Sequence, residues 1–247
     1  MHRSLLPLVA AFAAAACPPA LAADWYTGAA VVEPRDAWIV AIDSSATLSS
    51  QGSQFAMATV TAAPVSSLVQ SGLRLRFDGL LGSYRTGVGG GRSVIGDQEE
   101  VAALAGYAWV WPEAVFSAFV GLNLRRNELL QLDAGVPSDR TEVGLKTALD
   151  YYARPTVGTM VHATGSYSTT FNAYYGRVRG GIAAFAGGYV GPEFALLGDD
   201  YYRQWRVGAH LSGMQFGPVQ FGLSAGYLHD HAQKGGLYTT VDMRTGF

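Results

Sequence analysis

The chain has 247 residues, of which 49% are hydrophobic, 15% are charged and 31 are glycine, with a net charge of −2. Soluble domains carry about 25% charged residues, so most of this surface is not expected to face water. Beyond the N-terminus no stretch has the roughly 18 apolar residues of a membrane-spanning helix. The lack of clustered lysine and arginine excludes nucleic acid as a partner. This composition favours a protein that crosses a membrane with strands and contacts outer-membrane lipid.

The N-terminus has the pattern of a secretory signal peptide over residues 1–22. An apolar run over Leu5–Ala16 precedes a small-x-small cleavage site at Ala20-Leu21-Ala22. The single cysteine, Cys17, lies inside this segment, so cleavage before Ala23 leaves a mature chain without cysteine. We therefore expect export to the bacterial outer membrane, with residues 23–247 as the barrel and residues 23–36 as a periplasmic arm or a first strand.

Alternation with a period of two residues is the dominant pattern of the mature chain. It is clearest over Gln204–Met214, where Trp205, Val207, Ala209 and Leu211 share one face, and Gln204, Arg206, Gly208, His210 and Ser212 share the other. A soluble β-sandwich also alternates, but it would leave its polar faces in water and carry more charge. The sequence therefore predicts an all-β fold, a transmembrane antiparallel up-and-down β-barrel.

We expect about twelve strands, with ten or fourteen as alternatives, because the segments approach the roughly 9–11 residues that a tilted strand needs to cross a bilayer. They span 37–46, 54–62, 72–85, 100–110, 115–125, 141–152, 156–167, 171–180, 182–193, 203–214, 219–230 and 236–247. Short links are predicted at Trp111–Ala114, Ala153–Pro155 and Gln215–Pro218, and longer polar outer loops at Thr86–Glu99, Arg126–Arg140 and Phe194–Tyr202.

The C-terminal segment resembles the signal by which outer-membrane barrels are recognised for assembly. Counting back by twos from the terminal Phe247 gives a mostly apolar stripe that reaches Leu237. Aromatic residues near the predicted strand ends fit interfacial girdles, namely Trp38, Tyr84, Trp109, Trp111, Tyr167 and Trp205.

The inward face of the predicted barrel gathers charges of both signs. They are Arg74, Arg76, Asp78, Glu142, Lys146, Asp150, Arg206, His210, Asp242 and Arg244. One interpretation is a structural ion network that fills or narrows the lumen, because an unpaired buried charge is costly. The other is a polar path or a sugar-binding wall.

Two short motifs suggest chemistry. His210 and Ser212 share one strand face, as in barrel phospholipases and lipid A deacylases, and could form a nucleophilic pair. In those families the pair faces lipid, whereas here it lies on the face of Arg206. His229-Asp230-His231 is weak evidence for a metal site, since it falls in a predicted outer loop. No catalytic residue, metal or cofactor is predicted.

Several segments resemble the cellulose biosynthesis protein BcsS family. They are Tyr189-Val190-Gly191-Pro192-Glu193, Tyr202 to His210, Gly72-Leu73-Arg74-Leu75-Arg76, Gly82-Ser83-Tyr84, Ala105-Gly106-Tyr107 and Gly226-Tyr227. The resemblance covers most of the mature chain. It implies an outer-membrane accessory to bacterial cellulose secretion, with β-glucan (cellulose) and other components of a cellulose synthase system as partners.

Three hypotheses remain open from the sequence. The first is a non-enzymatic barrel that assists biosynthesis, export or surface organisation of cellulose. The second is a lipid hydrolase built on His210 and Ser212. The third is a structural or adhesive barrel that acts through its outer loops.

Overall fold

The computed structural model describes residues 39–88, 92–130, 138–185, 187–231 and 234–247. The expectations for the signal peptide, for residues 23–36 and for Trp38 lie outside these residues. Within them, no helix is long and apolar enough to cross a membrane.

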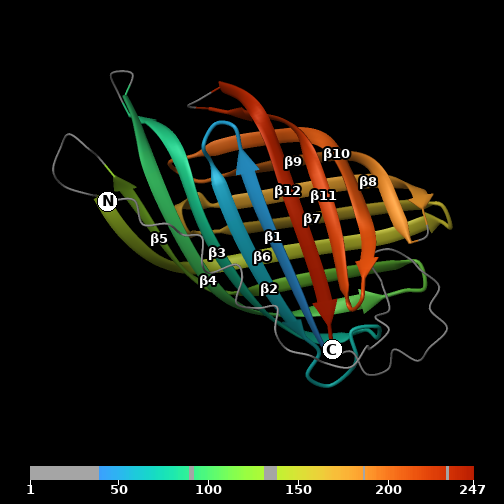
Figure 1. Cartoon of the computed structure of the whole chain (residues 1–247). Helices are drawn as coiled ribbons and strands as arrows, with labels where there is room; N and C mark the ends of the chain where they lie inside the picture. The colour runs from blue at the N-terminus through green and yellow to red at the C-terminus, as the bar shows by residue number, and fades with distance from the viewer. Residues whose placement is uncertain (1–38, 89–91, 131–137, 186, 232–233) are drawn as a thin grey trace.

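The described chain forms a closed antiparallel barrel of twelve strands, which confirms the predicted fold class (Figure 1). The strands are β1 (Val40–Ser49), β2 (Gln54–Ala62), β3 (Gly72–Val88), β4 (Arg92–Val110), β5 (Ala114–Leu130), β6 (Ser138–Thr156), β7 (Thr159–Ser168), β8 (Tyr174–Phe185), β9 (Gly188–Gly198), β10 (Arg203–Phe216), β11 (Val219–Asp230) and β12 (Lys234–Gly246). A 3-10 turn, η1 (Thr170–Asn172), lies between β7 and β8.

The barrel closes where β1 pairs with β12, and these two strands lie side by side in Figure 1. Their register runs from Ala41 opposite Gly246 to Ser49 opposite Tyr238. The backbone N–H of Phe247 also donates to the carbonyl of Val40 at 2.9 Å, so the pairing continues to the last residue. We call the end of the barrel with Phe247 the inner end and the opposite end the outer end.

The outward face carries an apolar band, because each strand exposes alternate residues. Aliphatic side chains such as Val120, Leu122 and Leu145 are more than half exposed although they lie in mid-strand. Aromatic residues border the band, with Trp109 stacked on Phe116 towards the inner end and Trp205 in contact with Tyr227 towards the outer end. This surface is that of a barrel in lipid.

The girdle prediction fails for one residue. Trp109, Trp111, Tyr167 and Trp205 are exposed, but Tyr84 is fully buried in the lumen. Tyr84 lies on the same inward face of β3 as Arg74 and Asp78. Its ring contacts that of Tyr202, with the centroids 4.8 Å apart.

The long outer loops predicted at Thr86–Glu99 and Arg126–Arg140 are mainly strand. Strands β3 to β6 have 17 to 19 residues each, against 10 in β1 and 9 in β2. A crossing needs only about 9–11 residues, so these strands continue above the apolar band. Outward residues there such as Arg85, Glu99 and Arg126 are polar because they face water, and the polarity does not mark a loop.

Other boundaries differ from the prediction in the same direction. Most of Phe194–Tyr202 belongs to β9, which leaves a short connection at 199–202. Ala153–Pro155 lies within β6, and its irregular register places the turn at 157–158. Strand β8 continues to Phe185 and β9 begins at Gly188, so the connection between them does not fall at 181.

Candidate functional site

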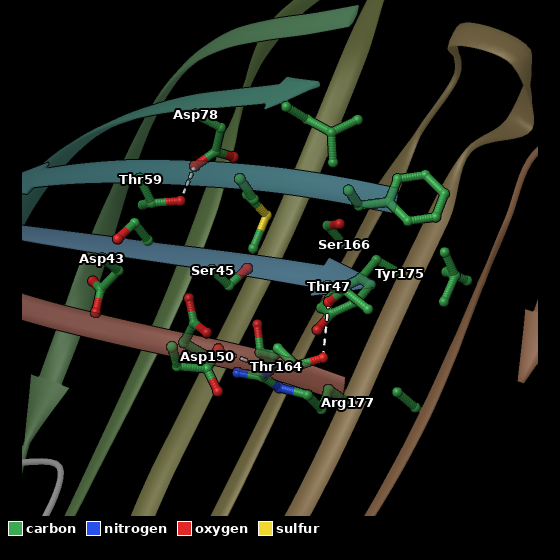
Figure 2. A pocket seen from close by; sticks show the side chains of 18 of the residues that line it. Asp43, Ser45, Thr47, Thr59, Asp78, Asp150, Thr164, Ser166, Tyr175 and Arg177 are labelled. Atoms are coloured by element: carbon green, nitrogen blue, oxygen red, sulfur yellow. Dashed lines mark hydrogen bonds and ion pairs between the residues drawn. The ribbon is translucent and has the colours of Figure 1, made fainter. Parts of the chain in front are cut away.

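The interior of the barrel holds an elongated cavity of about 260 Å³, lined by all twelve strands. Figure 2 shows part of its wall, where Asp43, Ser45 and Thr47 of β1 and Asp78 of β3 project into the space. Barrels of 8 strands are filled by ordinary side chains and those of 16–18 strands leave a channel. A barrel of intermediate size therefore needs long side chains, and here arginine and tyrosine supply them.

A first charge chain runs along the wall formed by β3 to β6 with strictly alternating sign. Its members in order are Asp150, Arg76, Asp78, Lys146, Glu100, Arg125 and Asp199. Consecutive contacts measure 2.6, 2.7, 2.9, 2.7, 3.1 and 2.7 Å. Because each interior member has two partners of opposite sign, the chain compensates the cost of removing these groups from bulk water.

A second charge chain occupies the wall formed by β8, β9, β11 and β12. Arg179 is almost fully buried and pairs with Glu193 and, at 2.5 Å, with Asp242, which also pairs with Arg177 at 3.1 Å. The hydroxyl of Ser224 accepts from Arg179 at 2.7 Å and donates to Glu193 at 2.9 Å. Every charged group of this chain is thus bonded, and the wall is rigidly cross-linked.

The connection between β9 and β10 lies at the outer end of the cavity, where Asp199 and Tyr202 line it. Tyr202 packs on Tyr84 and on Phe55, whose ring centroid lies 6.0 Å from that of Tyr202. This connection also contacts η1, because the backbone N–H of Asp200 donates to the carbonyl of Phe171 at 2.9 Å. We call residues 169–173 and 199–202 together the outer cap.

Residues 63–71, which connect β2 to β3, lie at the inner end of the barrel. The buried guanidinium of Arg74 donates to the carbonyl oxygens of Ser67, Leu68 and Gln70 at 3.2, 3.4 and 2.5 Å, and to the hydroxyl of Ser66 at 3.1 Å. Leu68 lines the cavity. We call this connection the inner loop; Arg74 holds it against the barrel and has no carboxylate partner among the residues that the structure describes.

Most of the inward residues expected from the sequence line the cavity, namely Arg74, Arg76, Asp78, Lys146, Asp150, Arg206, Asp242 and Arg244. Glu142 instead lies at the outer rim, where it pairs with Arg140 at 3.0 Å and accepts from the backbone N–H of Phe171 at 3.0 Å. His210 is 1% exposed and does not line the cavity.

Sequence reasoning missed several charged groups of the lumen, most of which belong to the charge chains. They are Asp43, Glu100, Arg125, Arg177, Arg179, Glu193 and Asp199. The alternation itself held the signal for Arg125, because Asn123 and Asn127 share its parity and are also buried. Glu100 and Arg125 were not predicted as lumen residues, because each stands at the end of a predicted strand.

His210 and Ser212 do not form a nucleophilic pair. The Nε2 atom of His210 lies 3.1 Å from the carbonyl oxygen of Gly180. Neither its Nδ1 atom nor the Ser212 hydroxyl has a hydrogen-bond partner among the described residues, so the two groups do not bond each other. Both face inward and are buried, whereas an acyl ester would lie on the lipid side.

The described residues contain no group of three or more metal-ligating side chains arranged to hold an ion. His229 faces outward and stacks on Trp205, whereas Asp230 points inward and is 1% exposed, so adjacent members of His229-Asp230-His231 lie on opposite faces. Chemically, the cavity offers hydroxyl, carboxylate and guanidinium groups to water or to a small polar solute.

The closed barrel, its apolar outer band and its charged lumen define the class: a transmembrane β-barrel of the outer-membrane type. The cellulose biosynthesis protein BcsS family model matches residues 44–247, and the chain belongs to this family.

Among solved structures, an outer membrane channel from Pseudomonas putida F1 (COG4313) is similar, with a TM-score of 0.51, 11% identity and coverage of 92% of this chain and 100% of that chain. The KdgM porin has a TM-score of 0.49 and 12% identity, over 84% of this chain and 99% of that one. The β domain of the Bordetella autotransporter BrkA has a TM-score of 0.49 and 12% identity, over 86% and 100%. The comparison with curated protein sequences gave no match.

Proposed function

We propose that the protein is a non-enzymatic outer-membrane accessory of bacterial cellulose production, which assists export or surface organisation of the β-glucan. The observation that carries this proposal is the family match over residues 44–247. The fold adds a location, since a closed barrel with an apolar outward band is suited to the outer membrane. Export would follow cleavage of a signal peptide after Ala22, with residues 23–36 left on the periplasmic side.

The size of the lumen favours an accessory role in which the polymer stays outside the barrel. It argues against a role as the conduit through which the polymer passes. Its free volume of about 260 Å³ is spread along the whole barrel. Pockets for single small molecules take about 300–1,000 Å³, so a train of sugar rings does not fit this space. The outer cap and the inner loop lie at its two ends, and the two charge chains cross-link the wall between them.

The part of the barrel that is available to the polymer is the outer rim. Strands β3 to β6 rise above the apolar band, and their outward residues there include Arg126, which pairs with Asp139 at 2.7 Å. This raised wall would present polar groups to glucan or to other components of a cellulose synthase system at the cell surface. In the adhesive alternative the same wall binds other surfaces. That alternative predicts that the amount of cellulose does not depend on this protein.

A deletion and complementation experiment in the native host tests the proposal. Deleting the gene should lower or misplace surface cellulose, measured by dye binding and by cellulase-released glucose in cell and medium fractions, and the wild-type gene should restore it. Unchanged cellulose in both fractions, combined with loss of cell-to-cell attachment, would support the adhesive barrel instead. A hydrolysed or deacylated lipid that disappears in the deletion strain would support the hydrolase.

A further inference from the structure

Arg206 differs from the other charged groups of the lumen. It lies on β10 with its side chain inward, is 6% exposed, and lines the cavity. Its Nε donates to Oε1 of Gln204 at 2.5 Å, and its Nη1 reaches the hydroxyl of Thr47 at 3.4 Å. No ion pair joins it to a carboxylate in the described chain, and its Nη2 makes no hydrogen bond there.

The other described lumen cations are compensated. Arg76, Arg125, Lys146, Arg177, Arg179 and Arg244 each pair with a carboxylate. Arg74 uses backbone carbonyl oxygens instead. Burying a guanidinium without a counter-charge is costly, so a barrel that keeps one facing its cavity is expected to find an anion for it.

Two acidic side chains of the neighbouring strands β9 and β11 are engaged elsewhere. Glu193 is bonded by Arg179 and Ser224 and accepts from the hydroxyl of Tyr238 at 3.0 Å. Asp230 stands opposite Gln204 in the pairing of β10 with β11, and it is bonded to Tyr202. Asp230 therefore faces the outer cap, and it leaves Arg206 without a direct partner.

The surroundings of Arg206 suit a small polar ligand with one acidic group. The guanidinium carbon lies 6.0 Å from the ring centroid of Phe55 and 5.5 Å from that of Tyr238, so aromatic rings flank it. The hydroxyls of Thr47 and Thr240 bond each other at 2.8 Å beside it. A planar guanidinium binds carboxylate and phosphate through parallel N–H···O bonds.

We propose that Arg206 anchors an oxyanion-binding subsite in the upper lumen, which takes a small ligand bearing a carboxylate or phosphate group. The free volume limits the ligand to the size of an inorganic anion or of one acidic sugar. Aromatic rings and hydroxyls around the guanidinium are groups that also contact sugar rings. The subsite is independent of whether the protein serves cellulose production.

Isothermal titration calorimetry on the purified barrel in detergent, at constant ionic strength, tests this subsite. Inorganic phosphate, D-glucuronate and D-glucose are titrated into wild type, Arg206→Gln and Arg203→Gln. Arg203→Gln is the matched control, because it removes the same charge from an exposed position on the same strand, outside the lumen. A shift between boiled and unboiled samples on a denaturing gel shows that each variant is folded.

We expect phosphate or glucuronate to bind wild type and Arg203→Gln equally, glucose not to bind, and Arg206→Gln to lose about tenfold or more in affinity. Binding of phosphate alone identifies a free oxyanion as the ligand, and stronger binding of glucuronate identifies an acidic sugar. Should Arg206→Gln not fold, Arg206→Lys keeps the charge but not the fork, and it should also bind more weakly. Absence of binding to wild type, equal binding by the Arg206 variant that folds, or equal binding of glucose would overturn the proposal.

Discussion

Arg125 of β5 and Asp199 of the β9–β10 connection form an ion pair across the lumen, with Nη2 and Oδ2 2.7 Å apart. The other carboxylate oxygen of Asp199 accepts from the backbone N–H groups of Tyr201 and Tyr202 at 2.8 and 2.9 Å. One buried carboxylate therefore shapes the turn of the outer cap and also ties it to the opposite wall. This pair also ends the first charge chain, so the closure of the lumen and the stiffness of its wall are connected.

Replacing Asp199 with asparagine should loosen the outer cap without unfolding its turn. Asparagine keeps the oxygen that accepts from the two backbone N–H groups but leaves Arg125 without its counter-charge at this end. We expect a loss of about 1.5–3 kcal/mol in the free energy of unfolding, because Arg125 loses one charged hydrogen bond but keeps Glu100 as a counter-charge. Single-channel recordings in planar lipid bilayers should show higher conductance than wild type.

The control for this variant is Asp200→Asn, since Asp200 is exposed and contacts Asn172 only at the surface. It should change neither unfolding nor conductance. Equal conductance for Asp199→Asn and wild type would mean that the outer cap stays closed without the ion pair.

Replacing Arg74 with alanine should release the inner loop. The guanidinium is the common donor to carbonyls of Ser67, Leu68 and Gln70, and alanine removes all of these bonds. The cost should be at least the roughly 1.5–3 kcal/mol of one charged hydrogen bond. Elastase, which cleaves after small apolar residues, should cut residues 63–71 in the variant but not in wild type, as mass spectrometry of the fragments would show.

Arg203→Ala is the matched control, because Arg203 is an exposed arginine at the outer end. If the inner loop of Arg74→Ala stays resistant to elastase, the barrel wall and not Arg74 holds this loop.

The position of the membrane can be tested on a single strand. Leu145 and Thr141 both point outward from β6, but Leu145 lies in the apolar band and Thr141 lies above it. Leu145→Arg should cost about 2–4 kcal/mol and Thr141→Arg about 0–1 kcal/mol, because the penalty depends on depth in the bilayer. Urea unfolding in phospholipid vesicles measures the loss in free energy of unfolding for each variant. Equal losses would show that the apolar band does not mark the position of the membrane.

The sequence predicted the faces of the barrel because alternation is a local property of the pleated strand. Leu223 is exposed and Ser224 is buried, as period-2 parity requires. Strand ends were harder to predict, because they depend on where the membrane stops. Glu99 and Arg126 are paired strand residues above the apolar band, and their polarity resembles that of a loop.

Which charges meet inside the barrel could not be predicted from the sequence. Arg179 and Asp242 are 63 residues apart and touch only because β8 faces β12 across the lumen. The closure of the barrel, its tilt and the reach of each side chain decide such pairs. The partners of Ser224 could not be predicted either. Alternation along the strand shows only that its side chain points inward, whereas in the structure it bonds both Arg179 and Glu193.

The last prediction separates the accessory from the hydrolase. Ser212→Ala should leave cellulose output, lipid composition and stability unchanged, the free energy of unfolding staying within about 0.5 kcal/mol of wild type. The physical reason is that the Ser212 hydroxyl has no hydrogen-bond partner among the described residues, and so makes no hydrogen bond to His210, whose Nε2 lies 3.1 Å from the carbonyl oxygen of Gly180. Loss of a true nucleophile would instead lower the rate by several orders of magnitude. Lipid profiling compares the Ser212→Ala strain with wild type and with the full deletion. A lipid product that is present in wild type but missing from both other strains would identify Ser212 as a nucleophile and refute the accessory function.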